Sequence, residues 1–341
     1  MGPYTTIHLG GPADFFLEAN SDQEIIQGLA FAEDKNLRVR ILGGGSNVIF
    51  SDAGFRGLVI RVATRGIELE RETNHGSELR VQAGHEWDAF VEHCVRANLS
   101  GVECLSGIPG TAGGVPIQNV GAYGQEAKET IVSVRVYDRN AKSIISIPGT
   151  ECEFGYRTSR FKHREAGRFI ILDVLFALRN DSSPPRYPEL ITKMQDPAIS
   201  GISPHPLAVR TAVLSLRKAK SMVHSAEDPD SISCGSFFTN PVLDAESLAK
   251  LEAKMKSSGL TMPRAYPDGH NFKVSAAFLV ENAGFHKGLV RGGAGVSTKH
   301  ALALINRGGT AADLLSLADE IKGEVLSRFG IQLEMEPEYI V

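Results

Sequence analysis

The sequence predicts an α+β fold in which helices cover mixed β-sheets. In the first half of the chain, short apolar segments at residues 38–42, 58–62 and 79–83 are bounded by turn residues, a pattern typical of strands. Between and after these segments, apolar residues recur at helical spacing. With 341 residues, the chain is long enough for two or three domains that each bury a core.

Two helices are expected among these strands. Ser21, followed three residues later by Glu24, forms a capping box, and four apolar residues then repeat at helical spacing: Ile25, Ile26, Leu29 and Ala32. The second helix is expected at residues 86–97, and it should bury Trp87, Phe90, Val91 and Cys94.

The second half of the chain predicts helices at about residues 245–257, 274–282 and 311–327, each followed by a glycine that can end it: Gly259, Gly284 and Gly330. A polar, proline-bearing stretch at residues 180–186 interrupts the pattern, and residues 197–206 are interpreted as a linker. We therefore expect a domain boundary near residue 205.

Charge and hydropathy exclude several classes of protein. The 36 Lys and Arg residues stand against 40 Asp and Glu residues without a run of like charges, so no electrostatic feature indicates a nucleic-acid partner. The longest apolar stretch, residues 169–178, is interrupted by Asp173 and is too short to span a bilayer. Because no Lys or Arg precedes Lys35, we expect no secretory signal. We expect a cytoplasmic protein without membrane insertion.

Cysteine and histidine spacing gives no metal or disulfide pattern. The four cysteines form no Cys-x-x-Cys pair, which argues against a disulfide framework or a thiolate zinc site: Cys94, Cys104, Cys152 and Cys234. The ten histidines include no His-x-x-x-His pair. Buried, reduced thiols and no bound metal are expected.

A first glycine loop directly follows the expected strand at residues 38–42. Gly43, Gly44 and Gly45 precede Ser46 and Asn47, so bare backbone N–H groups could approach a diphosphate. A tight turn is the structural alternative. The loop lacks the Gly-Lys-Ser/Thr of a P-loop and the spaced glycines of a Rossmann dinucleotide site.

A second glycine cluster spans residues 106–124. It is too rich in glycine for a helix and too apolar for a flexible linker, so another part of the protein or a ligand is expected to pack against it. Two such loops suggest one long ligand with two polar ends.

The two loops, together with residues 155–162, the Gly-Ser-Phe-Phe-Thr-Asn-Pro segment at 235–241 and the Leu-Glu-Met-Glu segment at 333–336, are similar to the UDP-N-acetylenolpyruvoylglucosamine reductases. These are flavin-dependent reductases of peptidoglycan precursor synthesis. The matching segments cover essentially the whole chain and occur in the same order as in the family. The segment at 235–241 is specific to this family.

The resemblance implies a two-lobed FAD-binding module of the PCMH type, as in vanillyl-alcohol-oxidase-like flavoproteins, plus a separate α+β substrate-binding domain. The expected ranges are 1–65 for the first FAD lobe, to which a tail at 337–341 could return, 66–205 for the second lobe, and 206–336 for the substrate domain. The first loop has no histidine for covalent attachment, so FAD should be noncovalent. The implied FAD-binding residues are Gly43, Gly44, Gly45, Ser46, Asn47, Gly110, Thr111, Gly113, Gly114, Gln118, Asn119, Gly121 and Ala122.

The implied reaction is the NADPH-dependent, FAD-mediated reduction of UDP-N-acetylglucosamine enolpyruvate to UDP-N-acetylmuramate. In the family, NADPH reduces FAD, the flavin N5 passes hydride to C3 of the substrate, and a proton is added at C2. The cofactor carries the hydride chemistry, while the protein must stabilise the charge that develops on the carboxylate.

Three residues match the catalytic residues of the family. Arg157 resembles the arginine at the substrate carboxylate, and Ser236 resembles the serine that protonates C2. Glu336 matches the glutamate that stabilises the enolate. Met335 stands where the family pattern has a proline, so the alignment of this segment has two alternatives. Glu334 or Glu338, two residues before and after Glu336, could be the equivalent of the family's glutamate.

The resemblance also implies a substrate-binding set: Tyr156, Tyr187, Lys220, Asn240 and Lys273. The segment from Tyr187 to Leu190 is similar to the substrate-covering loop of the longer family subtype. UDP-N-acetylglucosamine enolpyruvate and NADPH are the expected partners, and we expect a monomer.

Two other functions are weighed against this one. The first is another flavin-dependent oxidoreductase of the same fold, such as an oxidase, and the second is a non-catalytic FAD-binding or UDP-sugar-binding protein. NADPH oxidation with and without substrate discriminates among them, because an oxidase would consume oxygen and a binding protein would show neither activity.

Overall fold

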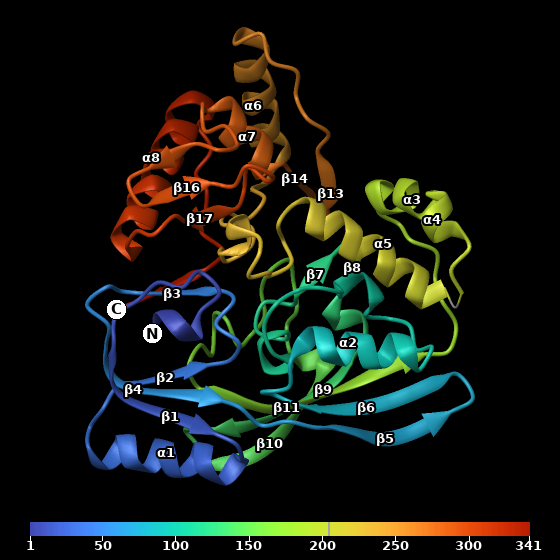
Figure 1. Ribbon diagram of the computed structural model, residues 1–341, viewed down its shortest axis with the longest axis vertical. Coiled ribbons are helices and arrows are strands. Elements are labelled where there is room, and N and C mark those ends of the chain that lie inside the picture. Colours follow the sequence, from blue (N-terminus) through green and yellow to red (C-terminus); the bar gives the residue numbers. More distant parts are fainter. Residues whose placement is uncertain (204) are drawn as a thin grey trace. The chain divides into compact units, whose positions relative to one another are not determined.

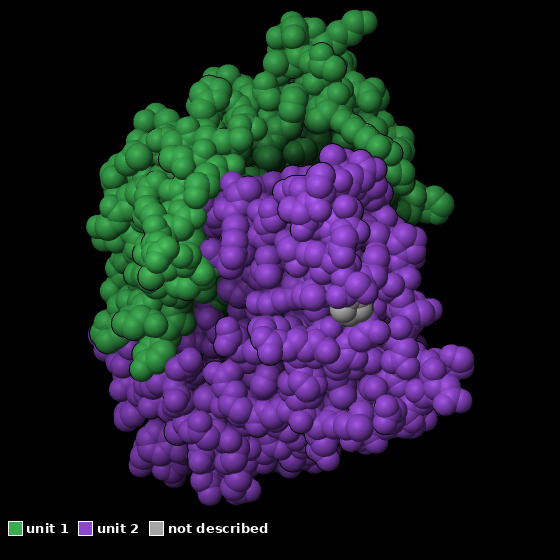
Figure 2. Space-filling view, turned by 45° about the vertical axis from the view of Figure 1, so that its right-hand side comes forward, with its two compact units in different colours: residues 1–12, 46–55, 224–341 green, residues 13–45, 56–223 purple. Residues whose placement is uncertain are grey.

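The computed structural model describes residues 1–203 and 205–341. The chain divides into two compact units, coloured separately in Figure 2. Unit 1 comprises residues 1–12, 46–55 and 224–341, and unit 2 comprises residues 13–45 and 56–223. Each unit is therefore assembled from segments that are far apart in the sequence.

A three-stranded sheet lies at the beginning of unit 2. Its strand order is β1-β4-β2, with β2 and β4 parallel, and helix α1 packs on it. A Cβ on Gly28 of α1 would lie 2.6 Å from Leu17 of β1, so the helix approaches the sheet closely. The bounds are β1 (Ala13–Ala19), α1 (Asp22–Asp34), β2 (Val39–Leu42) and β4 (Phe55–Val62).

A five-stranded antiparallel sheet, in the order β10-β9-β11-β6-β5, forms the larger part of unit 2. Helix α2 covers it, as Figure 1 shows, and Trp87 and Phe90 of α2 lie 5.7 and 5.1 Å from the Phe176 ring of β11. These rings are fully buried. The bounds are β5 (Ile67–Thr73), β6 (Gly76–Gln82), α2 (Trp87–Arg96), β9 (Ile131–Asp138), β10 (Ser143–Pro148) and β11 (Phe169–Arg179).

The remainder of unit 2 is a short hairpin and three helices. The helices enclose a small core of their own that includes Leu190, Ile199, Val209 and Val213. The bounds are β7 (Gly121–Ala122), β8 (Gln125–Glu126), α3 (Pro188–Met194), α4 (Pro197–Ser200) and α5 (His205–Ala219).

Unit 1 combines small sheets with three helices around one core. The segment at residues 46–55 belongs here because β3 pairs in parallel with β18, and because Asp52 accepts hydrogen bonds from the backbone N–H groups of Ala311 and Ala312 at the start of α8. The bounds are β3 (Val48–Phe50), β12 (Val242–Leu243), α6 (Ala245–Ser257), β13 (Tyr266–Asp268), β14 (Asn271–Lys273), α7 (Ala276–Asn282), β15 (Val290–Arg291), β16 (Ala294–Val296), β17 (Leu304–Asn306), α8 (Ala311–Phe329) and β18 (Glu338–Ile340).

The predicted α+β class is confirmed, as are the strands around residues 38–42, 58–62 and 79–83 and the five expected helices, with shifts of up to two or three residues at some ends. Gly330 ends α8 in the left-handed conformation, with φ 70°. The capping box is only half formed, since Ser21 accepts from the Glu24 N–H but the Glu24 carboxylate binds Asn20 N instead of Ser21 N.

The prediction of a linker at residues 197–206 is wrong, apart from Pro204, which lies outside the described residues. Prolines there begin helices instead of interrupting them, because proline lacks only an N–H that the first turn leaves unused: Pro197 begins α4, and Pro206 is the second residue of α5. The predicted ranges of the two FAD lobes and the substrate domain, 1–65, 66–205 and 206–336, stay a prediction. The C-terminal tail lies beside residues 48–50, through the pairing of β18 with β3.

Candidate functional site

The two glycine loops meet in unit 2. A Cβ on Gly44 would lie 2.6 Å from Cα of Gly110, and one on Gly43 would lie 2.6 Å from Oγ1 of Thr111. Such distances are too short for any side chain, so glycine at residue 44 is required by the approach of one backbone to the other. The loops predicted from separate parts of the sequence therefore form one structure.

Backbone hydrogen bonds fix the second loop against α2 and β6. Trp87 N–H donates to Gly110 O over 3.0 Å, and Gly113 N–H donates to Ala83 O over 2.8 Å. A Cβ on Gly114, in contrast, would meet no heavy atom within 4 Å. The loop is therefore anchored at Gly110 and Gly113 and has open space at Gly114. A loop that binds a phosphate group needs both features.

The later part of the second loop binds Arg157. Nη2 of Arg157 donates to Gly121 O over 2.9 Å, next to Ala122 in β7, and the guanidinium lies 5.6 Å from the ring centre of Tyr156. Arg157 has φ 55°, in the left-handed region that a non-glycine residue rarely adopts. The structure thus brings this cation to the edge of the candidate cofactor loop.

Asn119 shapes the loop through its side chain. Its Nδ2 donates to Gly155 O and to Glu126, both over 2.9 Å, and its Oδ1 accepts from Lys128 N over 3.0 Å. Gln118 precedes it and is half-buried. The amide of Asn119 is therefore engaged with the protein, and a structural role for it is supported.

The Tyr187 segment lies close to Tyr123 and to Lys220, of which only Lys220 was predicted to bind the substrate. The Tyr187 and Tyr123 rings are edge to face with centres 5.5 Å apart, and Nζ of Lys220 lies 2.6 Å from the Glu189 carboxylate. Leu190, the last residue of the segment, is fully buried. One side of this segment is thus held by packing and the other by a partly exposed ion pair.

Sequence reasoning missed Arg217, which lies on α5 three residues before Lys220. Its Nη2 donates to Met222 O over 2.7 Å, while its buried Nε has no partner among the described residues. Burial lowers the pKa of this guanidinium, and the charge of Arg157 acts in the same direction. A partly buried cation with a buried, unused donor is suited to an anionic ligand. Nothing local in the sequence distinguishes it from a surface arginine.

Helix α5 is tied to the second loop through Asp88 of α2. Oδ1 of Asp88 accepts from Gly107 N–H and from Nη1 of Arg210, each over 2.6 Å, and Arg210 also donates to Oδ2 over 2.9 Å. A two-pronged Arg–carboxylate pair is rigid in both distance and angle. Helix α5, which carries Arg217 and ends one residue before Lys220, is therefore held in register with the loop.

Ser236 and Glu336 lie on neighbouring segments of unit 1. Glu336 N–H donates to Phe237 O over 2.9 Å, Thr239 N–H donates to Glu334 O over 3.0 Å, and Phe238 forms a β-bridge with Met335. Of the three candidate glutamates, Glu336 is half-buried, whereas the two alternatives are exposed.

The end of the first loop reaches this pair from within unit 1. Nδ2 of Asn47 donates to Glu336 O over 3.2 Å, and Glu338 N–H donates to Asn47 O over 3.0 Å. Ser46 precedes Asn47 in the same turn. The structure therefore places part of a predicted cofactor loop beside a predicted catalytic residue.

Asn240 and Lys273 stand near the start of α7. Oδ1 of Asn240 accepts from Ala276 N–H over 3.0 Å, and Nζ of Lys273 lies 3.4 Å from Asp268. Lys273 pairs with Val242 between β14 and β12. Ser236, Asn240, Lys273 and Glu336 thus belong to unit 1, while Tyr156, Arg157, Tyr187 and Lys220 belong to unit 2.

The four cysteines are free and buried, as predicted. Burial raises the pKa of Cys104, Cys152 and Cys234 to about 12. The described residues contain no group of three or more side chains that could hold a metal ion. Within the same part of the chain, no helix has both the length and the apolar character needed to cross a membrane.

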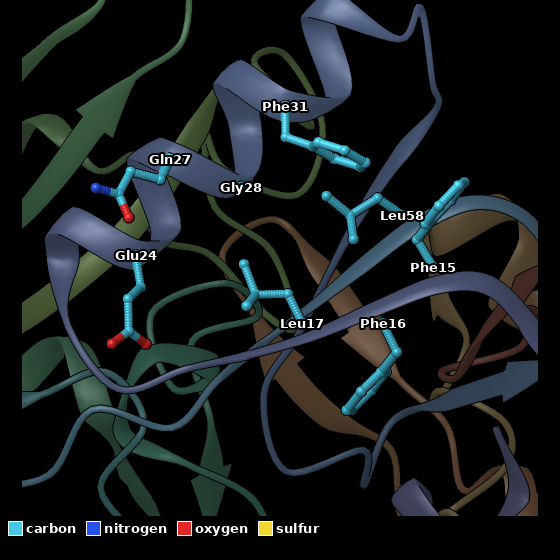
Figure 3. A pocket seen from close by; sticks show the side chains of 8 residues that line it. All are labelled: Phe15, Phe16, Leu17, Glu24, Gln27, Gly28, Phe31 and Leu58. Atoms are coloured by element: carbon cyan, nitrogen blue, oxygen red, sulfur yellow. The ribbon is translucent and has the colours of Figure 1, made fainter.

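A separate pocket of about 320 Å³ lies between α1, β1 and β4 in unit 2, and Figure 3 shows its lining. Phe15 and Phe31 stack edge to face there, 5.5 Å apart. None of the predicted site residues lines this pocket, which includes Glu24, Gln27 and Leu58. It is therefore distinct from the candidate site.

Comparisons with known proteins match both parts of the chain. Residues 13–145 match a family model described as an FAD binding domain, and residues 228–340 match one for the C-terminal domain of UDP-N-acetylenolpyruvoylglucosamine reductase. The predicted combination of an FAD-binding module with a separate second domain is thereby confirmed.

Relatives match over almost the full length. The chain is similar to UDP-N-acetylenolpyruvoylglucosamine reductases of Thermobifida fusca, with 47% identity over 99% of this chain and 95% of the relative, and of Salinispora arenicola, with 46% identity over 99% and 93%. The crystal structure of the Thermus caldophilus enzyme of that name is similar with a TM-score of 0.66 and 26% identity, covering 100% of this chain and 97% of the other.

Proposed function

Because the chain belongs to the UDP-N-acetylenolpyruvoylglucosamine reductase family and is an FAD-binding oxidoreductase, we propose that it reduces UDP-N-acetylglucosamine enolpyruvate to UDP-N-acetylmuramate with NADPH as the reductant. The observation that carries the residue assignment is the backbone pairing of the Ser236 segment with the Glu336 segment. Noncovalent FAD, a monomeric state and a cytoplasmic location are parts of the same proposal.

The glycine loops fit an FAD diphosphate. Close contact between Gly44 and Gly110 leaves no room for side chains, and the open space at Gly114 is where a Cβ would otherwise intrude on a ligand. FAD, when bound, supplies the hydride-transfer chemistry that no side chain offers. The residues that would hold it are the thirteen of the two loops, with Asn119 acting chiefly through loop shape.

Arg157 is proposed to bind the substrate carboxylate. The planar donors of its guanidinium suit two carboxylate oxygens at once. Reduction at C3 moves negative charge toward that carboxylate, so Arg157 stabilises the reacting state more than the ground state. The hydrogen bond to Gly121 supports this role, because it restrains the guanidinium beside the cofactor loop.

Ser236 is proposed to deliver the proton to C2 from its Oγ. An alcohol is a weak acid, but a carbanion at C2 is a far stronger base than an alkoxide, so the transfer is favourable once the two atoms are aligned. Glu336 is proposed as the group that donates a hydrogen bond to the developing charge. Its half-buried position beside the Ser236 segment favours it over the exposed Glu334 and Glu338.

The UDP end of the substrate is assigned to the remaining cations and polar groups. Lys220 and Lys273 offer compact charges for a diphosphate, Tyr187 offers a ring and a hydroxyl, and Asn240 offers an amide. In the structure Lys220 pairs with Glu189 and Lys273 pairs with Asp268. When substrate binds, each lysine would leave its carboxylate partner and pair with a phosphate. Tyr156 completes the set beside Arg157.

The experiment that tests the proposal combines a visible spectrum with an NADPH oxidation assay. A yellow protein that releases its colour on denaturation is expected for noncovalent FAD. NADPH oxidation should depend on the enolpyruvyl substrate. Oxygen consumption without that substrate would point to an oxidase, and a coloured protein with neither activity would point to a binding protein.

A further inference from the structure

Asp230 is a buried carboxylate that no part of the proposed mechanism uses. It is 3% exposed and lies in a short 3₁₀ turn, Pro229–Ser231, six residues before Ser236. Its Oδ2 accepts from Oγ of Ser297 over 2.9 Å and from both N and Oγ1 of Thr298 over 2.6 Å, while its Oδ1 accepts from Arg307. Four donors thus converge on one carboxylate.

The charge of Asp230 is stabilised in this place. Burial alone would raise the pKa of Asp230, but the hydrogen bonds from Thr298 and Ser297 and the charge of Arg307 outweigh burial and lower it. A carboxylate accepts all four donors because it has no hydrogen of its own. An asparagine would turn an NH₂ group toward some of these donors.

The loop that Asp230 holds also holds the residue after Ser236. Ser297 and Thr298 begin the connection from β16 to β17. In the same connection, the carbonyl of Leu302 accepts from Phe237 N–H over 2.7 Å. Phe237 is fully buried, so its position fixes the backbone next to the serine.

The segment between Asp230 and Ser236 is fixed along its length as well. Asn306 N–H donates to Ile232 O over 3.1 Å, Ser233 forms a β-bridge with Ile305, and Oγ of Ser233 accepts from Gly235 N–H over 3.1 Å. The chain therefore has little freedom to re-aim Ser236 unless the β16–β17 connection moves.

We propose that Asp230 is the positioning residue for the proton donor Ser236, and that it acts through the β16–β17 connection and the Leu302–Phe237 hydrogen bond. This inference rests on the proposed function, because it takes Ser236 as the acid. Asp230 touches neither substrate nor cofactor in this scheme. Its contribution is the alignment of Oγ with the carbon that receives the proton.

The test is Asp230→Asn in the FAD-loaded enzyme, followed by stopped-flow absorbance of the flavin. Misalignment of a reacting group by about 1 Å can cost on the order of 10²-fold in rate. We expect substrate-dependent flavin reoxidation to slow roughly 10- to 100-fold, while flavin reduction by NADPH changes less than about twofold. The solvent deuterium isotope effect on reoxidation should rise, because proton delivery becomes limiting.

Asp228→Asn is the matched control. Asp228 directly precedes the turn and accepts from Asp230 N over 3.1 Å, a bond that the Asn oxygen can keep. Its ion pair with Lys299, over 3.0 Å, also reaches the β16–β17 connection, but both side chains are partly exposed, so its loss should move the connection little. Both half-reactions should stay near wild type in this variant. A second readout is hydrogen exchange at the Phe237 amide, which should be faster in Asp230→Asn and unchanged in the control.

Thr298→Val provides a milder change if Asp230→Asn does not fold, because it removes one of the four hydrogen bonds and keeps the shape of the side chain. It should slow reoxidation less, in the same direction. Equal slowing of both half-reactions, or unchanged reoxidation in every variant, would overturn the inference. Failure of the wild type to reoxidise with the enolpyruvyl substrate would instead overturn the proposed function, and the exchange experiment would still report whether Asp230 orders Phe237.

Discussion

Two regions that contain predicted site residues, one in each unit, are built in opposite ways. In unit 2 the glycine loops approach so closely that a Cβ on Gly44 would lie 2.6 Å from Gly110. In unit 1 the Ser236 segment is held by strand-like pairing with the Glu336 segment and by the fully buried Phe237 and Phe238. The close approach of the loops in unit 2 requires glycine, which has no side chain, whereas the Ser236 segment in unit 1 is fixed by large aromatic side chains.

The difference fits the role that we propose for each region. A diphosphate is bound best by backbone N–H groups that can come close to it, so side chains are an obstacle. A proton donor must hold one oxygen in one direction, so the backbone beneath it has to be immobile, and buried aromatic anchors provide that. Mutations should therefore affect ligand retention in the first region and one step of the reaction in the second.

The largest effect is expected for Ser236→Ala. Loss of a positioned proton donor costs on the order of 10² to 10⁴ in rate, and this loss should fall on substrate-dependent flavin reoxidation alone. FAD should stay bound and its reduction by NADPH should be nearly unchanged. Stopped-flow absorbance resolves both phases in one protein.

Ser236→Cys serves as the companion variant, because a thiol can supply a proton from a similar position. It should recover part of the lost rate. If Ser236→Ala slowed flavin reduction as much as reoxidation, the serine would have a structural role and Glu336 would become the first candidate for the acid.

A smaller but structural effect is expected for Gly44→Ala. The added Cβ would meet backbone atoms of Gly110 at 2.6 and 2.9 Å, and overpacking of this kind typically costs about 1–3 kcal/mol. We expect a lower melting temperature of the apoprotein and weaker FAD retention, measured by thermal denaturation and by flavin fluorescence after gel filtration.

Gly114→Ala is its counterpart, since nothing within 4 Å opposes the new Cβ. The apoprotein should be as stable as the wild type, and only FAD retention should fall. Full flavin occupancy in Gly114→Ala would remove this residue from the cradle, and full occupancy in both variants would contradict the assignment of the loops.

A more modest change is expected around Tyr187 when substrate binds. Arg186 is exposed and precedes the segment, and the Lys220–Glu189 pair is too exposed to contribute more than about 1 kcal/mol. Substrate that recruits Lys220 and Tyr187 should order the segment and slow tryptic cleavage at Arg186. Identical cleavage with and without the UDP-sugar would argue against a covering loop.

The smallest effects are expected in the labelling rates of two buried thiols, one near each region. Cys104 precedes the second glycine loop and Cys234 lies two residues before Ser236, and burial raises the pKa of each to about 12. At pH 8 both should react with a thiol reagent only after local opening. Added FAD should slow labelling of Cys104 more than labelling of Cys234, which peptide mass spectrometry can measure.

The same thiols predict the sign of one pH effect. In the unfolded chain a cysteine loses its proton near its ordinary pKa of 9.0, whereas in the folded chain it keeps the proton to about pH 12. The folded state therefore binds more protons between these values, and the free energy of unfolding should fall as the pH rises above 9. Urea titrations at pH 8 and pH 10 would test this, with a Cys104→Ser variant as the control for one thiol.

Local patterns predicted the regular elements of both regions well. Helix α2 buries the four residues that its spacing indicated, and α8 ends at Gly330 as expected, because helix periodicity and terminal residues act within a few positions along the chain. The glycine loops were also visible in the sequence, since bare backbone after a strand is a local property. Helix α5 was missed because Pro206, near its start, was interpreted as part of a linker, although proline is compatible with the first turn of a helix.

Long-range pairing decided what the patterns could not. Residues 46–55 belong to unit 1 because Asp52 accepts hydrogen bonds from the first residues of α8 and because β3 pairs with β18. These contacts join residues more than 250 positions apart in the sequence. Arg217 and Asp230 looked like ordinary charged residues, because burial and convergent donors exist only after distant segments have packed. The sequence therefore contained the identity of the chemical groups and the local shape of each loop. The environment of each group depends on the tertiary structure, since solvent exclusion and hydrogen-bond partners arise from contacts between segments that the local sequence does not specify.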